Sequence, residues 1–209
     1  MPRALFLAVL VPALLAAQAP PKSAPLPAVG VFMIFDSTPG TNAVDLMKSE
    51  VDQLLQPAGL ALDWRLASEN HGNQPFDGLV VIQFKGSCKA ESGPLAANDF
   101  GTAGESHILG STTVTNGRVM PYGEVQCDQI RKALAYLPPG ADQKARQKAL
   151  GVALGRVVAH ELYHMLAKTT THAGHGLAKA SQSFEDLVSE REILFAEDDA
   201  RAIHQALAK

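Results

Sequence analysis

The strongest constraint on the fold is a long helical pattern over residues 142–168, which contains the motif His160-Glu161-Leu162-Tyr163-His164. Apolar residues recur along this pattern at the three- and four-residue spacing of one helix face. They are Leu150, Leu154, Val158, Leu162 and Met165. The two histidines of the motif are one helical turn apart and lie on the flank of this apolar face. The sequence therefore predicts a buried helix that presents two imidazoles and a carboxylate to a cleft.

The spacing of the two histidines suits a zinc ion, which binds ring nitrogens at about 2 Å. Glu161 projects beside them and can take a proton from a metal-bound water. His172 and His175 follow closely, so four of the seven histidines gather in one short stretch. The alternative interpretation is a helix with incidental surface histidines, and this clustering argues against it.

Elements of both secondary-structure types are expected before this helix. The first part of the chain predicts a buried strand over 29–35, a helix over 44–55 capped by Thr41 or Asn42, a half-buried strand over 60–66 and a strand over 79–84. The next part predicts a long loop over 86–104, a hairpin of 108–114 and 118–120 around Asn116-Gly117, and a helix over 125–137. An amphipathic helix over 184–207 is expected to close the fold. Gly151 and Gly155 are expected to let the long helix pack closely against a sheet.

The amino terminus is typical of an export signal. Arg3 precedes an apolar run over 4–15 that is too short to span a bilayer, and Ala17-Gln18-Ala19 has the small-x-small pattern of a cleavage site. We expect a signal peptide over 1–19, a Pro-rich spacer over 20–28 and one domain over 29–209. The mature protein is then secreted or periplasmic, without stable membrane association after cleavage. An uncleaved anchor is the alternative, because Pro20 directly follows the cleavage pattern and signal peptidases generally tolerate proline badly there.

The two cysteines, Cys88 and Cys127, agree with export because an oxidising compartment allows one disulfide between them. Such a crosslink closes a loop of roughly forty residues and contributes about 4 kcal/mol by the loop-entropy model. Two reduced core thiols are the alternative.

Size and charge limit the other function classes. A chain of 209 residues with 46% hydrophobic content can bury the core of one domain, and no repeat divides it. The net charge of −3, without a cluster of Lys and Arg, argues against a nucleic-acid partner. We expect a monomer.

The motif and the order of elements resemble the zincins, the fold of many zinc metalloproteases, and among them the metzincins best. The resemblance implies an α+β fold with a mixed twisted sheet, a backing helix, an active-site helix that carries HExxH and a C-terminal helix. Metzincins continue from the second histidine through a Gly to a third zinc-binding histidine and a later Met-turn. Here these positions fall on Ala167 and Thr170, and no Met occurs between Gly176 and Ser183.

Three residues are therefore candidates for the third metal ligand. His172 is favoured because a modest lengthening of the turn brings it to the expected place, and His175 is the second choice. The gluzincin branch instead takes a Glu from a later helix, about twenty residues beyond the second histidine, and Glu185 is near that distance. The remaining histidines, His71, His107 and His204, are isolated and expected at the surface.

The resemblance implies a zinc metallopeptidase that hydrolyses peptide bonds in a peptide or protein substrate. A zinc-activated water would attack the peptide carbonyl, and Glu161 would be the general base. An extended peptide would pair with an edge strand, for which 108–114 is the candidate, and Tyr122 or Tyr163 is a candidate donor to the oxyanion. The alternative is a noncatalytic exported domain with a structural zinc site and a partner-binding role, including a closed site of His160, His164, His172 and His175.

Overall fold

The computed structural model describes residues 26–69, 72, 74–90, 108–132, 134, 137–138, 140–189, 191 and 193–207. The expected signal peptide over 1–19, residues 20–25 of the expected spacer and residues 91–104 of the expected long loop lie outside the described residues. His71 and His107 also lie outside them.

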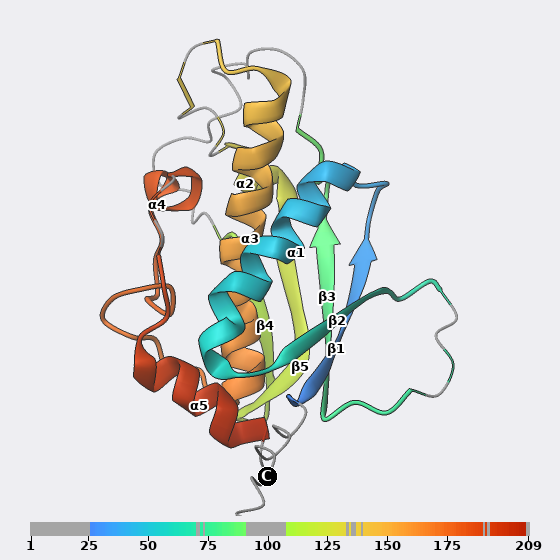
Figure 1. Ribbon diagram of the computed structural model, residues 1–209, viewed down its shortest axis with the longest axis vertical. Helices are drawn as coiled ribbons and strands as arrows, with labels where there is room; N and C mark the ends of the chain where they lie inside the picture. Colours follow the sequence, from blue (N-terminus) through green and yellow to red (C-terminus); the bar gives the residue numbers. More distant parts are fainter. Residues whose placement is uncertain are drawn as a thin grey trace, which may run out of the picture.

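The fold is α+β, with a five-stranded, mostly parallel twisted sheet in the order β2-β1-β3-β5-β4 (Figure 1). The strands are β1 (Ala28–Phe35), β2 (Ala61–Leu66), β3 (Gly78–Lys85), β4 (Gly110–Thr115) and β5 (Arg118–Gln126). β1 pairs in parallel with β2 and β3, and β3 pairs in parallel with β5. β4 pairs antiparallel with β5 and forms one edge of the sheet. The predicted strand over 108–114 is therefore an edge strand, as expected.

One face of the sheet is packed against helices. In β1 the side chains of Val29, Val31 and Met33 are buried, whereas Phe32 and Ile34 are more exposed, and β3 buries Val80, Ile82 and Phe84 between more exposed neighbours. The parallel register sets these two rows side by side, with Val31 opposite Val80 and Met33 opposite Ile82. The half-buried strand predicted over 60–66 forms as β2, but its burial does not alternate, because the side chains from Leu62 to Arg65 are all partly buried.

The first helix, α1 (Thr41–Leu55), covers this face together with the later helix α3 (Gln143–Ala167), as Figure 1 shows. Its predicted capping residue is wrong, because Gly40 is the N-cap and no side chain makes a cap hydrogen bond. The short 3-10 turn η1 (Gln56–Ala58) then ends at Gly59, whose positive φ of 65° turns the chain into β2.

The hairpin prediction is confirmed, because Asn116 and Gly117 join β4 to β5 with φ of 52° and 73°. The predicted helix over 125–137 starts too early, since Val125 is a fully buried residue of β5 that pairs with Gly110 and Phe84. Among the described residues of this stretch, the α-helix is α2 (Cys127–Lys132). Burial of Val125 in the sheet determines its conformation, whereas its local helical spacing does not.

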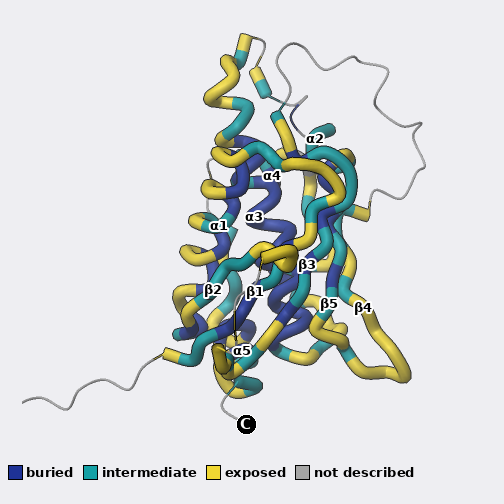
Figure 2. Tube along the Cα trace, turned by 90° about the vertical axis from the view of Figure 1, so that its right-hand side faces the viewer, coloured by how far each residue is buried: buried dark blue, intermediate teal, exposed yellow. Residues whose placement is uncertain are grey.

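The long helix α3 occupies the predicted residues and starts at Asp142, whose side chain accepts a hydrogen bond from the backbone N–H of Ala145. Its predicted apolar stripe is buried, and Figure 2 shows the centre of α3 in the colour of buried residues. The expected role of its glycines needs correction. A Cβ on Gly151 would lie 2.5 Å from Cβ of Leu46, and one on Gly155 would lie 2.6 Å from Cβ of Glu50. The glycines therefore allow close approach of α1, and not of the sheet.

The single C-terminal helix predicted over 184–207 is wrong, because two helices form, α4 (Phe184–Val188) and α5 (Glu197–Leu207). The buried Arg156 of α3 contacts α4 and the chain after it, since its guanidinium donates to the carbonyl of Asp186 in α4 and to that of Arg191. Arg156 also donates to Glu50 of α1 over 3.2 Å. These contacts attach α4 and the following chain to α3 and α1, and α4 ends at Ser189, whose backbone is extended, where an uninterrupted helix was expected.

A disulfide joins Cys88, after β3, to Cys127 at the start of α2, so the expected pairing is present. Both residues are buried. None of the described helices combines the length and the apolar character needed to span a membrane.

Replacing Gly151 with Ala should destabilise the protein by roughly 1–3 kcal/mol, because the added methyl group meets Leu46 in a closely packed interface. An exposed helix would show the opposite sign, since Ala exceeds Gly in helix propensity by about 1 kcal/mol. Urea unfolding of the purified variant measures the change. Gly174→Ala is the control, because a Cβ there meets nothing within 4 Å. Equal or higher stability of Gly151→Ala would show that the two helices are not in close contact.

Replacing Cys88 and Cys127 together with Ala should lower the free energy of unfolding by about 4 kcal/mol, because the disulfide spans 39 residues of sequence and restricts the unfolded chain. Chemical denaturation of the oxidised wild type and the double variant gives this difference. A loss below about 1 kcal/mol would contradict the loop-entropy contribution.

Candidate metal centre

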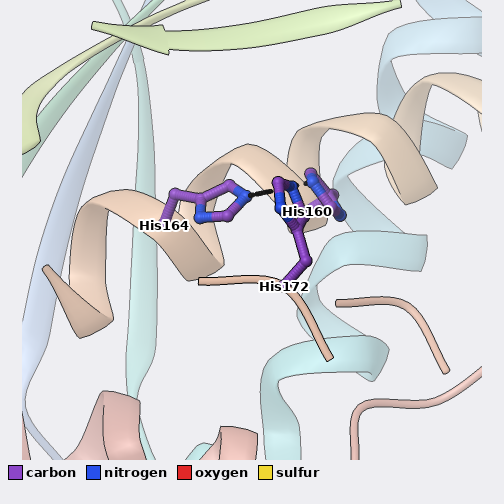
Figure 3. Close-up of side chains that lie close together, drawn as sticks. All are labelled: His160, His164 and His172. Atoms are coloured by element: carbon purple, nitrogen blue, oxygen red, sulfur yellow. Dashed lines mark hydrogen bonds between the residues drawn. The ribbon is translucent and has the colours of Figure 1, made fainter. Parts of the chain in front are cut away.

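Three imidazoles meet at the C-terminal half of α3 (Figure 3). Nε2 of His164 lies 3.1 Å from Nε2 of His160 and 3.2 Å from Nε2 of His172. These three side chains form a group whose possible ligand atoms all lie within 4.8 Å of one another. His160 and His164 come from successive turns of α3, and His172 comes from the chain that follows the helix. A metal ion could be held by these three residues.

The end of α3 fixes the ring of His164. Lys168 adopts the left-handed conformation with φ of 54°, and the backbone N–H groups of Lys168 and Thr169 both donate to the carbonyl of His164. This tight turn brings the carbonyl of Thr169 to 2.8 Å from Nδ1 of His164. A proton on Nδ1 satisfies this carbonyl and leaves the lone pair of Nε2 directed at the other two imidazoles.

A second carbonyl fixes His160. Its Nδ1 lies 2.8 Å from the carbonyl oxygen of Leu177, a residue that is fully buried in the loop after His172. The same tautomer argument leaves Nε2 of His160 free to bind a metal. Both helical histidines are thus oriented through Nδ1 by backbone oxygens, which is the arrangement that metal-binding histidines usually have.

The environment keeps the helical imidazoles neutral. Burial lowers the pKa of His160 to about 4, and the nearby His164 and His172 act in the same direction, whereas the hydrogen bond to Leu177 opposes the shift. Burial also lowers the pKa of His164. Because only a neutral imidazole has a lone pair to donate, both residues are available as metal ligands at neutral pH. The donor set therefore fits a metal ion.

The other two candidates for the third ligand lie outside this group. His175 is exposed, three residues after His172, and does not belong to the cluster that the described residues form. Glu185 is exposed on α4, where it lines a half-open cavity of about 700 Å³ between α1 and α3. His204 is exposed on α5 and its Nδ1 lies 3.2 Å from the carbonyl of Ala58.

Glu161 points toward strand β4. Its Oε2 accepts a hydrogen bond of 2.6 Å from the hydroxyl of Thr112. A Cβ on Gly110 would lie 2.6 Å from Oε1, so the missing side chain of this glycine leaves room for the carboxylate. Only 5% of Glu161 is exposed, and burial raises the pKa of its carboxyl to about 7, with the Thr112 hydrogen bond opposing the shift. The free energy of unfolding therefore decreases as the pH rises from about 4.5 to about 7. In this range Glu161 is ionised in the unfolded chain, whereas the folded carboxyl still holds its proton.

The hydroxyl groups of the two candidate tyrosines have partners other than the three histidines. The ring of Tyr163 is buried beside His164 and Phe195, with centroid distances of 5.3 and 5.7 Å, and burial together with the charge of Asp199 and a hydrogen bond to it raises the pKa of the Tyr163 hydroxyl. Tyr122 hydrogen-bonds to Gln83 of β3. Its neighbour Gly123 faces Met165 of α3, so strand alternation directs Tyr122 to the other face of the sheet.

Several residues of this site carry no recognisable sequence signal. Thr112 and Gly110 lie in the predicted edge strand, but their contact with Glu161 depends on the register of β4 beside α3. The backbone carbonyls of Thr169 and Leu177 orient the two helical imidazoles, and a backbone carbonyl is present whatever the side chain is, so the residue types at these positions do not predict this role. Only the positive φ of Lys168 and the tertiary position of the later loop bring them to the imidazoles.

Replacing Thr112 with Val should raise the pKa of Glu161 further, because it removes the hydrogen bond that stabilises the ionised carboxylate. The measurement is a pH titration of the metal-free protein, followed by the ¹³C signal of the Glu161 carboxyl. Thr112→Ser keeps the hydroxyl and should retain the wild-type titration. Thr113→Val, at an exposed position of the same strand, is the matched control. An unchanged titration in Thr112→Val would show that this hydroxyl does not act on Glu161.

In comparisons with known proteins, no family model matches the chain and no curated protein matches it by sequence.

Proposed function

We propose that the protein is an exported zinc metallopeptidase in which His160, His164 and His172 hold the ion and Glu161 is the general base. The observation that carries this proposal is the convergence of three Nε2 atoms, two of them on residues oriented by backbone carbonyls. Three imidazole ligands suit zinc and leave a position for water or substrate, as catalytic zinc sites require.

The bound ion would supply two effects, a lower pKa for a coordinated water and polarisation of the peptide carbonyl. Glu161 accepts the proton of the attacking water and returns it to the leaving amine. Burial raises the pKa of this carboxyl to about 7 in the metal-free protein, and a bound cation would lower it and so favour the ionised form that accepts the proton. Thr112 holds one carboxylate oxygen and so limits the orientations that Glu161 can adopt.

The arrangement of the elements also supports assignment to the zincin fold. Helix α3 carries the motif, α1 packs against it as a backing helix, and both cover one face of a mixed sheet. β4 is the antiparallel edge strand and contacts the motif through Thr112. An extended peptide that paired with β4 would therefore lie beside Glu161. The disulfide is in keeping with export to an oxidising compartment.

The second candidate function is a noncatalytic exported domain that binds a partner and uses the metal for stability. One observation favours it: Glu161 is buried and accepts a hydrogen bond from Thr112. This contact connects α3 to β4, so a purely structural role would also account for the carboxylate. The closed site of four histidines has no such support, because His175 is not in the cluster.

Metal binding is tested by the pair His172→Ala and His175→Ala. After reconstitution with zinc and removal of excess metal, mass spectrometry of the wild type should give about one zinc ion per chain. His172→Ala should lose most of it, because a ligand is removed, whereas His175→Ala should retain it. Loss of zinc from His175→Ala or from Glu185→Ala alone would identify a different third ligand. A wild type that binds no zinc would overturn the proposal.

Catalysis is tested by Glu161→Gln, with Glu185→Gln as the control at an exposed carboxylate. Zinc-loaded proteins are incubated with a library of quenched fluorescent peptides. Glu161→Gln should keep its zinc and lose about 100-fold or more in hydrolysis, because the amide cannot accept a proton. Hydrolysis at the wild-type rate by this variant would contradict the role of Glu161. A zinc-loaded wild type that cleaves none of the peptides would favour the noncatalytic function.

A further inference from the structure

Gln182, in the segment between the histidine cluster and α4, donates to two backbone carbonyls. Its Nε2 lies 3.0 Å from the carbonyl oxygen of Leu177 and 3.3 Å from that of Gly176. The carbonyl of Leu177 is the one that orients His160. The two lone pairs of this oxygen thus receive one proton from the candidate metal ligand and one from Gln182.

The orientation of the Gln182 amide is determined by these carbonyls, because only the nitrogen can donate to them. Its Oε1 is buried and has no hydrogen-bond partner among the described residues. An unsatisfied buried oxygen costs roughly 1–3 kcal/mol. The amide keeps its two hydrogen bonds to the loop although its oxygen is left unsatisfied. This indicates that the carbonyls of the loop determine the conformation of the Gln182 side chain.

The same loop also carries His172. Ala173 bridges to Lys179, and the backbone N–H of Ala173 donates to the carbonyl of Ala178 over 2.9 Å. These contacts close the loop immediately after His172. The backbone N–H of Leu177 donates to the carbonyl of Leu194, which attaches the closed loop to the segment before α5.

We propose that Gln182 is a positioning residue of the metal centre. By holding the Leu177 and Gly176 carbonyls it fixes the acceptor that selects the tautomer and orientation of His160, and it stabilises the loop that begins at His172. This inference depends on metal binding by the three histidines, which is part of the proposed function, but it does not depend on catalysis.

The test compares Gln182→Met with Gln205→Met, a matched change at an exposed position of α5. Methionine keeps the length of the side chain and removes both donors. Zinc affinity is measured by competition with a chromophoric chelator at neutral pH. Gln182→Met should bind zinc more weakly than the wild type, by up to about 10-fold, because the direct partner of His160 remains and only its support is removed; loss of a direct partner typically costs about 10- to 100-fold. Gln205→Met should bind with the wild-type affinity.

A spectroscopic measurement separates positioning from a general loss of stability. Cobalt in place of zinc gives visible absorption bands that depend on the geometry of its ligands. Gln182→Met should shift these bands at full cobalt occupancy, because His160 loses its fixed orientation, and Gln205→Met should not. If Gln182→Met does not fold, Gln182→Glu gives the same test with a side chain of similar shape that cannot donate when ionised. Unchanged affinity and spectrum in a folded Gln182 variant would overturn the inference.

The two levels of the hypothesis fail differently. If the wild type binds neither zinc nor cobalt, the metal centre itself is rejected, and Gln182 as a positioning residue with it. If the wild type binds metal and the Gln182 variants bind it equally well, the metal centre stands and only the role of Gln182 is rejected.

Discussion

The close packing of α3 between α1 and the sheet is the constraint on which the rest of the structure depends. Gly151 and Gly155 bring α1 so near that a Cβ on either residue would overlap it. The opposite side of α3 contacts β3, β4 and β5. A helix held on both sides cannot rotate, so the direction of its remaining flank is fixed. That flank carries His160, Glu161 and His164, and their directions therefore follow from apolar packing elsewhere on the helix.

Burial of polar groups on this flank then imposes hydrogen bonds. An imidazole in a low-dielectric environment needs a partner for its N–H, and each of the two helical histidines has a backbone carbonyl at 2.8 Å. These carbonyls come from the turn at Lys168 and from the loop around Leu177, so two separate segments of chain are tied to the helix end. The same bonds leave both Nε2 atoms on one side, where His172 meets them. The hydrogen bonds that satisfy the buried imidazoles therefore also attach the neighbouring segments to the helix and assemble the three-histidine cluster.

Glu161 links the helix to the edge of the sheet. Its carboxylate occupies the space above Gly110 and accepts from Thr112, so β4 contacts the motif as well as forming the outer strand. A peptide bound along β4 would contact the strand that holds the proposed general base. The carboxyl thus connects α3 to β4, and burial raises its pKa to about 7 in the metal-free protein. Its replacement by Gln is informative for this reason, since the amide keeps the shape and removes the charge.

The sequence alone determined the elements with a strong local pattern. The period of α3, the strands β1 and β3, and the Asn116-Gly117 hairpin follow from hydrophobic spacing and turn chemistry, which act between near neighbours. The pairing of His160 with His164 is of this kind, because helix geometry fixes it. Tertiary structure decided the rest. Val125 is a strand residue because the sheet buries it, and the expected C-terminal helix is interrupted after α4, where the carbonyl of Arg191 accepts a hydrogen bond from Arg156 of α3. The position of His172, rather than His175, beside the two helical imidazoles depends on contacts between separate segments of the chain. The partner of Glu161 and the carbonyls that orient the imidazoles depend on such contacts as well, and local sequence patterns contain no information on these distances.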